Sequence, residues 1–267
     1  MDGMEAAYVS RRRPKLVRGV PPLAIVGWLR SGWADFLRAP APGLVIGSMC
    51  TTFAWTMLIV LHATGTMLLI APLIAGFTLI APRLAIGLYE SSRRQERGEA
   101  ITVACILDAS DRNPVQIWAM GALLGCFLLG WMAVAYLVLL TFTLVSWLGG
   151  LAFFFGGDSV PLEAVAVENW DLLLEAGLAG AALAVAAFGL SAISLPMLVD
   201  RKVTAVTAAL TSVRACLANP LTAALWGATL LVLSLIATVP AFLGFVVVLP
   251  VLGHASWHAY RALVEVD

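Results

Sequence analysis

The segment GLVIGSMCTTFAWTMLIVLH, residues 43–62, contains no Lys, Arg, Asp or Glu. A membrane-spanning helix needs about 20 mostly apolar residues, because the hydrocarbon layer is about 30 Å thick and each helical residue rises about 1.5 Å. The whole chain of 267 residues has the same character, since 61% of it is apolar and only 12% is charged. Soluble domains carry about 25% charged residues. The sequence therefore predicts a membrane protein.

Six such segments are predicted to form an all-α polytopic membrane helix bundle. They are residues 43–62, 67–89, 115–142, 172–198, 221–239 and 241–260. Lys and Arg occur only in every second connection or at the corresponding end of a segment, whereas the long connection before residue 172 carries Asp158, Glu163 and Glu168 and no base. Because Lys and Arg in short loops stay on the cytoplasmic side, we expect both termini in the cytoplasm.

The first 21 residues are predicted to be a basic cytoplasmic tail, and residues 22–267 a single membrane domain. The bases of the tail run from Arg11 to Arg18, without the folded basic face or aromatic platform that a nucleic-acid site needs. We therefore expect the tail to contact anionic membrane lipids and predict no nucleic-acid partner.

Within the membrane domain, three tripeptides begin similar units. RAP at 38–40, RNP at 112–114 and ANP at 218–220 each open a predicted spanning helix, and a glycine follows each proline by seven residues, at Gly47, Gly121 and Gly227. Proline is favoured in the first helical turn because its missing N–H would have no partner there. The pattern predicts three imperfect repeats of an interfacial helix plus a hairpin, at about 22–95, 96–200 and 201–262.

Small residues four positions apart let membrane helices approach closely. Three such pairs occur, Gly43 with Gly47, Gly121 with Gly125, and Ala223 with Gly227. The first, third and fifth spanning helices are therefore predicted to pack through them.

Amphipathic segments precede these helices. Before the first one, Ile25, Trp28, Gly32 and Phe36 share an apolar face, and Asp35 is assigned to the opposite side. A similar apolar stripe, at residues 206, 210, 213 and 217, precedes the last hairpin. Helices of this kind are typical of the membrane interface.

Prolines also interrupt the second, fourth and sixth segments, at Pro82, Pro196 and Pro250, and are expected to kink them. Arg83 follows directly within an apolar run, where a central charge costs roughly 3 kcal/mol, and Glu90 lies on the same helical face. Interrupted helices of repeated hairpins often form transport sites, so these five residues are a candidate site for lipid or an anionic solute. The alternative is that Arg83 extends to the cytoplasmic surface.

Two of the three histidines, His254 and His258, are four residues apart near the cytoplasmic end of the last segment. Such a pair can bind a metal ion, and one imidazole can be a haem ligand. The alternative is that both anchor the helix at headgroup depth beside Trp257 and Tyr260, with no cofactor. The chain has no HExxH, GxSxG, Walker or dinucleotide-binding motif, which argues against an enzyme.

Several of these stretches resemble a known family. AGF at 75–77, APRL at 81–84, GLYESSRR at 87–94 and LPVLGHASWHAYR at 249–261 are similar to the domain of unknown function 2189 family, a group of bacterial integral membrane proteins. The resemblance extends over about residues 31–264. It implies a multi-pass protein of the bacterial inner (cytoplasmic) membrane and names no activity.

Three classes of function remain. The sequence favours a non-enzymatic scaffold or accessory subunit of a membrane complex, because small-residue packing pairs are frequent and buried polar groups are few. Its partners would be membrane lipids and other membrane subunits. The alternatives are a transporter or lipid-handling protein that uses Arg83 and the interrupted helices, and a haem- or metal-binding respiratory component that uses His254 and His258.

Overall fold

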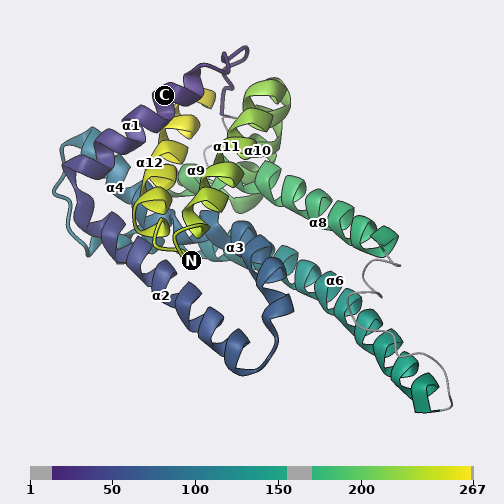
Figure 1. Ribbon diagram of the computed structural model, residues 1–267. Helices are drawn as coiled ribbons and strands as arrows, with labels where there is room; N and C mark the ends of the chain where they lie inside the picture. The colour runs from purple at the N-terminus through teal and green to yellow at the C-terminus, as the bar shows by residue number, and fades with distance from the viewer. Residues whose placement is uncertain (1–13, 155–169, 266–267) are drawn as a thin grey trace, which may run out of the picture.

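A computed structural model describes residues 14–154 and 170–265 of the chain (Figure 1). The structure is all-helical, with 83% helix and no strands in the described residues. Its elements are α1 (Ala24–Arg38), α2 (Pro40–Ala63), η2 (Met67–Leu69), α3 (Ile70–Leu84), α4 (Ile86–Arg97), α5 (Cys105–Asp111), α6 (Pro114–Phe154), α8 (Trp170–Ser191), α9 (Ser194–Asp200), α10 (Ala205–Ala218), α11 (Pro220–Thr238) and α12 (Phe245–Leu263). The predicted all-α class is confirmed. The acidic residues 158–168 and the bases 11–13 lie outside the described residues.

Within residues 14–154 and 170–265, four stretches are long and apolar enough to cross a membrane: Pro40–Ala63, Pro114–Val145, Trp170–Asp200 and Pro220–Thr238. The other two predicted segments differ. The segment 67–89 divides, because α3 ends at Leu84 and α4 begins at Ile86. The segment 241–260 becomes α12, whose second half carries His254, His258 and Arg261. Six spanning helices therefore stay a prediction.

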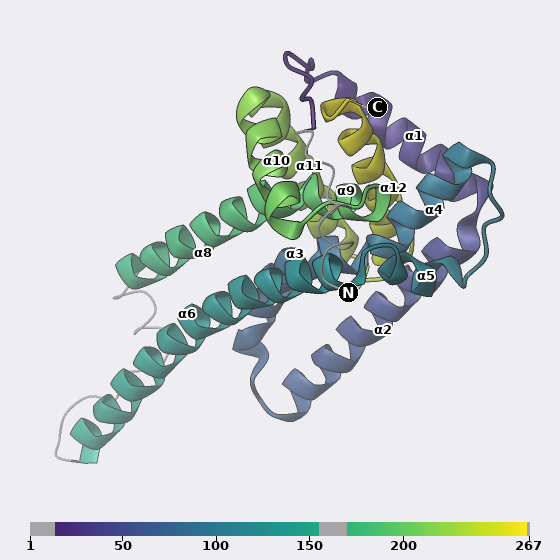
Figure 2. The same ribbon diagram turned by 180° about the vertical axis from the view of Figure 1, so that it is seen from behind.

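The long helices extend away from a helical body formed by the shorter ones (Figures 1 and 2). Helix α6 has 41 residues and continues twelve residues past the predicted end at 142. At about 1.5 Å per residue it is about 60 Å long, roughly twice the hydrocarbon thickness. Helices α2 and α8 project on the same side of the body.

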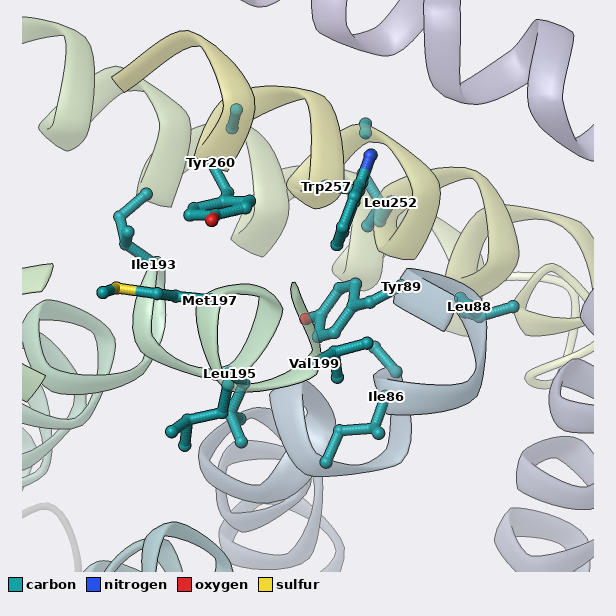
Figure 3. Packing of buried hydrophobic residues seen from close by; sticks show 14 of the residues in the cluster. Ile86, Leu88, Tyr89, Ile193, Leu195, Met197, Val199, Leu252, Trp257 and Tyr260 are labelled. Atoms are coloured by element: carbon teal, nitrogen blue, oxygen red, sulfur yellow. The ribbon is translucent and has the colours of Figure 1, made fainter. Parts of the chain in front are cut away.

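Three pairs of packed helices form a ring in the body of the protein. Helix α1 packs against α12, α5 against α4, and α10 against α9. The three helices that receive these contacts, α4, α9 and α12, also contact one another at the centre of the body. Their side chains point toward one another in Figure 3, where those labelled include Ile86, Tyr89, Leu195, Trp257 and Tyr260. The main core of the described residues includes this contact.

The buried face of helix α1 differs from the predicted one at a single named residue, Asp35. Ile25, Trp28 and Phe36 are buried, as expected, but Asp35 is buried with them. The expectation that Asp35 lies on the opposite side is wrong, because Asp35 follows Trp28 by seven residues, which is close to two helical turns. At Gly32, a Cβ atom would lie 2.6 Å from the Ala255 backbone nitrogen, so α1 and α12 are in direct backbone contact. In α10, by contrast, Val206, Leu210 and Leu217 remain exposed.

The two ends of the described chain lie side by side. Leu16 and Val264 form an antiparallel bridge, and the Val17 N–H donates to the Leu263 carbonyl at 3.1 Å. Asn219, the residue before Pro220, donates to the Val17 carbonyl at 2.8 Å. Asn113, at the equivalent position before Pro114, donates to the Val203 carbonyl at 2.8 Å. Both asparagines therefore hold an extended segment that leads into another part of the ring.

The turn between α11 and α12 lies beside the middle of α2. Thr51 donates to the Phe242 carbonyl at 3.2 Å, and the Trp55 indole N–H donates to the Ala241 carbonyl at 2.9 Å. Ala241 and Phe242 have positive φ angles of 49° and 66°, which side-chain-bearing residues rarely adopt. The hydrogen bonds from α2 hold this unfavourable turn in place. The turn of the α11–α12 hairpin therefore lies before the end of α2, which continues to Ala63.

Candidate functional site

A buried carboxylate links three helices of the body. Asp35 in α1 accepts hydrogen bonds from the Ser92 hydroxyl of α4 and from His258 Nε2 of α12, both at 2.8 Å. Ser92 Oγ also lies 2.7 Å from Nδ1 of His254. A hydroxyl has one hydrogen, which Ser92 gives to Asp35, so His254 must donate from Nδ1. This leaves Nε2 of His254 as an acceptor, and it has no partner among the described residues.

A second carboxylate, Glu90, lies nearby in α4 and is fully buried. Arg93 donates to both of its oxygens, from Nε at 2.7 Å and from Nη2 at 2.8 Å, and Arg94 donates from Nε at 2.9 Å. Arg112 approaches the same carboxylate at 3.7 Å. Bidentate arginine contacts of this kind are among the strongest hydrogen bonds in proteins. The Glu90 carboxylate therefore lies close to three guanidinium groups, those of Arg93, Arg94 and Arg112.

The surroundings of both carboxylates act on their pKa in opposing ways. Burial raises the pKa of Asp35, but hydrogen bonds from His258 and Ser92 outweigh it and bring the pKa below its usual value. Burial likewise raises the pKa of Glu90, and the hydrogen bonds from Arg93 and Arg94 reverse the effect and lower it. Both side chains are therefore held as carboxylates.

A third carboxylate, Asp200 at the end of α9, contacts the last turns of α12. The Tyr260 hydroxyl donates to it at 2.7 Å, and Arg261 lies 3.5 Å away. The Trp257 indole N–H donates to Glu96 at 2.9 Å, and Arg261 pairs with Glu96 at 3.1 Å. These contacts join α4, α9 and α12 where they meet.

The structure separates Arg83 from Glu90. The Arg83 guanidinium lies over the Trp118 ring, 4.8 Å from its centroid, in a cation–π contact between α3 and α6. The acceptor oxygens of Glu90 are used by Arg93 and Arg94 instead. Arg83 also lies against Gly121, where a Cβ atom would be 3.0 Å from its Nε.

The three predicted kink prolines occupy different positions. Pro82 and Pro250 lie inside α3 and α12, whereas Pro196 is in the first turn of α9, after a break in the helix at residues 192–193. Pro250 packs against Gly43, where a Cβ atom would lie 2.9 Å from its ring. Pro82 and Arg83 thus lie in α3, Pro196 in α9 and Pro250 in α12.

The two histidines each use one ring nitrogen for a contact inside the body. His258 Nε2 is engaged with Asp35, and His254 is fully buried with Nδ1 on Ser92. The described residues contain no group of three or more His, Cys, Asp or Glu side chains that could hold a metal ion. The imidazoles instead connect α12 to α1 and α4.

The predicted packing glycines meet three different partners. A Cβ atom at Gly47 would lie 2.7 Å from the Val246 backbone of α12, and one at Gly227 would lie 3.5 Å from the Phe188 ring of α8. Gly121 meets Arg83 of α3, and Gly125 has no described neighbour within 4 Å. In each of α2, α6 and α11, the glycine thus contacts the second helix of a different predicted hairpin.

One packing contact is absent from the sequence-based expectations. Trp131 of α6 fills the space left by two glycines, since a Cβ atom at Gly180 of α8 would lie 2.1 Å from its ring and one at Gly76 of α3 would lie 3.3 Å away. Its indole N–H donates to the Pro72 carbonyl at 2.7 Å. Neither glycine belongs to a pair that the pattern singled out, so the sequence carried little signal for this contact.

Two hollows accompany these clusters. A small apolar one of about 80 Å³ lies between α2, α3, α11 and α12, and its walls include Cys50, Phe77 and Phe245. A larger polar one of about 470 Å³ lies between the ends of α4 and α9 and the junction of α5 with α6. Pro82, Arg83, Pro196 and Pro250 line neither.

Comparison with known proteins supports the resemblance seen in the sequence. A family model described as predicted integral membrane protein (DUF2189) matches residues 69–200, which include the motifs at 75–94. The stretch at 249–261 and the rest of the expected range lie outside the match. No curated protein and no solved structure matches the chain. Over residues 69–200, the chain therefore matches the DUF2189 family of predicted integral membrane proteins.

Proposed function

We propose that this integral membrane protein is a non-enzymatic scaffold or accessory subunit of a complex in the bacterial inner membrane. The proposal rests on the contacts that the buried ionisable side chains of this protein make. The ionisable side chains of Asp35, Glu90, Arg93 and His254 are buried, and each is bonded to another helix or to a neighbouring side chain of the body. Charges in a transport pathway usually face a cavity, whereas these hold helices together.

The outer surface supports the same proposal. Helix α6 leaves Leu129, Leu137 and Leu144 exposed along about 23 Å of its length. A contiguous apolar surface of this size inside a membrane is available to lipid and to neighbouring membrane helices. A scaffold requires such a surface.

The proposed topology has six inserted helices in three repeats, with both termini in the cytoplasm. The pairing of Leu16 with Val264 supports termini on one side. The ring supports the repeats, because the first helix of each proposed repeat, α1, α5 or α10, packs against the last helix of the preceding one. The turn at Ala241 and Phe242, beside the middle of α2, indicates that the third hairpin inserts less deeply than the first.

Site-specific photocrosslinking in cells tests the scaffold. A photoreactive residue at Leu137 or Leu144 of α6 should give a protein adduct of one defined mass. The same residue at Leu124, which is fully buried in the same helix, should give none. Adducts to lipid alone from both exposed positions would contradict the scaffold.

A lipid- or anionic-solute-handling protein is the second candidate, and the position of the Arg83 cation within the apolar helix α3 favours it. Arg83 would then attract the anionic group from its place over Trp118. Arg83→Ala should leave insertion intact and weaken binding of an anionic lipid in reconstituted vesicles. Unchanged binding would remove Arg83 from the site.

A further inference from the structure

The polar hollow has the size and charge of a ligand site. Its volume of about 470 Å³ falls in the range of about 300–1,000 Å³ that small-molecule sites occupy. Five basic side chains and three carboxylates line it, so the lining carries an excess of two positive charges. It lies directly before Pro114, where α6 begins, and therefore opens at the level where a candidate span starts.

The carboxylates near the hollow are shared among several cations. Asp200 lies 3.7 Å from Arg97, 3.7 Å from Arg201 and 3.5 Å from Arg261, and its shortest contact is the 2.7 Å hydrogen bond from Tyr260. N–H to oxygen hydrogen bonds are about 2.7–3.2 Å long. Arg97, which is 51% exposed, therefore lies near Asp200 without giving it a close hydrogen bond.

Arg112 and Lys202, which also line the hollow, are arranged in a similar way. Glu90 accepts its close hydrogen bonds from Arg93 and Arg94, and Arg112 remains 3.7 Å away. Lys202 donates to the Arg112 carbonyl, which places a second cation beside Arg112. A lysine has three N–H donors and an arginine five, so both side chains keep donors for a ligand.

We propose that this hollow binds a phosphoryl group. Arg97, Arg112 and Lys202 supply guanidinium forks and a compact ammonium, the combination that recognises phosphate oxygens. Asp111, which also lines the hollow, opposes the ligand and weakens its binding. The phosphoryl group belongs either to a lipid headgroup of the adjacent leaflet or to a soluble phosphate compound.

Calorimetric titration of the purified protein in neutral detergent separates the two sources. One arm uses inorganic pyrophosphate, and the other uses short-chain phosphatidylglycerol, with short-chain phosphatidylcholine as the zwitterionic control. Tighter binding of pyrophosphate assigns a soluble ligand. Tighter binding of phosphatidylglycerol, with weaker binding of phosphatidylcholine, assigns a lipid headgroup.

Variants of opposite sign test the site itself. The double variant Arg97→Gln with Lys202→Gln should raise the Kd of the better ligand about tenfold, because two charge-assisted contacts are lost. Asp111→Asn should lower the Kd about threefold, because a nearby negative charge is removed. Arg30→Gln with Arg214→Gln removes the same charge from exposed positions that do not line the hollow and should leave the Kd unchanged.

The proposal is overturned if neither ligand binds, or if the Arg30 and Arg214 control weakens binding as much as the Arg97 and Lys202 variant. It is also overturned if Asp111→Asn fails to tighten binding. A purely structural role for these ion pairs predicts no tightening from the loss of a carboxylate. Failure of the scaffold in the crosslinking experiment would not affect this outcome.

Discussion

The α2–α12 and α8–α11 interfaces are built around equivalent glycines and pack very differently. At Gly47, a Cβ atom would lie 2.7 Å from the Val246 backbone, whereas at Gly227 it would make an ordinary 3.5 Å contact with the Phe188 ring. Both glycines follow the helix-opening proline by seven residues. In the first interface the backbones touch, and in the second a phenyl ring keeps them apart. A glycine in a membrane helix therefore provides room, and the partner residue decides whether a backbone occupies it.

The largest effect is expected for Gly47→Ala. The new methyl group would collide with backbone atoms of Val246, which cannot move aside as a flexible side chain does. Overpacking of this kind typically destabilises by about 1–3 kcal/mol, and we expect the upper end. Unfolding in mixed detergent micelles measures it. Gly125→Ala, whose surroundings are open, is the matched control, and an equal loss in both variants would refute the close contact.

An intermediate effect is expected for Gly121→Ala. Its Cβ atom would lie 3.0 Å from Nε of Arg83, a long side chain that can rotate away from α6. We expect a loss of about 1 kcal/mol, because the guanidinium would have to leave the Trp118 ring. Combining Gly121→Ala with Arg83→Ala removes the obstacle, and the glycine substitution should then cost nothing further. An additive loss would show that Arg83 is not the obstacle.

A pH titration distinguishes the two interfaces, because carboxylates with a lowered pKa lie near the α2–α12 interface. Next to the α2–α12 contact, α1 is tied to α12 through Asp35, whose pKa is lowered, as is that of Glu90 in α4. A lowered folded-state pKa gives stability that is present above the unfolded value of about 4 and is lost as the pH falls through the folded value. Amide exchange in α12 should therefore accelerate below about pH 4.

Asp35→Asn serves as the control for this titration. It should make α12 exchange faster at neutral pH and remove the part of the acid response that Asp35 contributes. The α8–α11 contact should respond less. Equal acid sensitivity at Phe188 and at Val246 would contradict the assignment.

The smallest effect is expected for Gly227→Ala. A Cβ atom at 3.5 Å from Phe188 fits without movement, and alanine favours a helix over glycine by about 0.5–1 kcal/mol. The variant should therefore be as stable as the wild type or slightly more stable in the same micelle assay. A loss comparable to that of Gly47→Ala would erase the difference between the interfaces.

Much of the helix content could be predicted because it depends on local sequence. Helices α2, α6 and α11 begin at Pro40, Pro114 and Pro220, as the junction motifs predict. The break at Ala85 and the late start of α12 at Phe245 were missed. Both depend on contacts with other helices, such as the hydrogen bonds from Thr51 and Trp55 to the turn before α12. The hydropathy of the sequence does not reveal such contacts.

The candidate site was predictable only in part. Glu90, His254 and His258 stand out because polar residues are rare in this chain. Asp35 lies 223 positions from His258, and Ser92 lies 162 positions from His254, so no spacing in the sequence could pair them. Helical periodicity did contain one usable signal, which is that Asp35 shares the face of Trp28 and Gly32.

The closed ring has a consequence for biosynthesis. Helix α1 is translated before α12, yet its Gly32 packs directly on the α12 backbone and its Asp35 accepts a hydrogen bond from His258 of α12. Until α12 is made, this part of the α1 surface stays uncovered. A nascent chain interrupted before Phe245 would keep that face open, which would mark it for quality-control proteases.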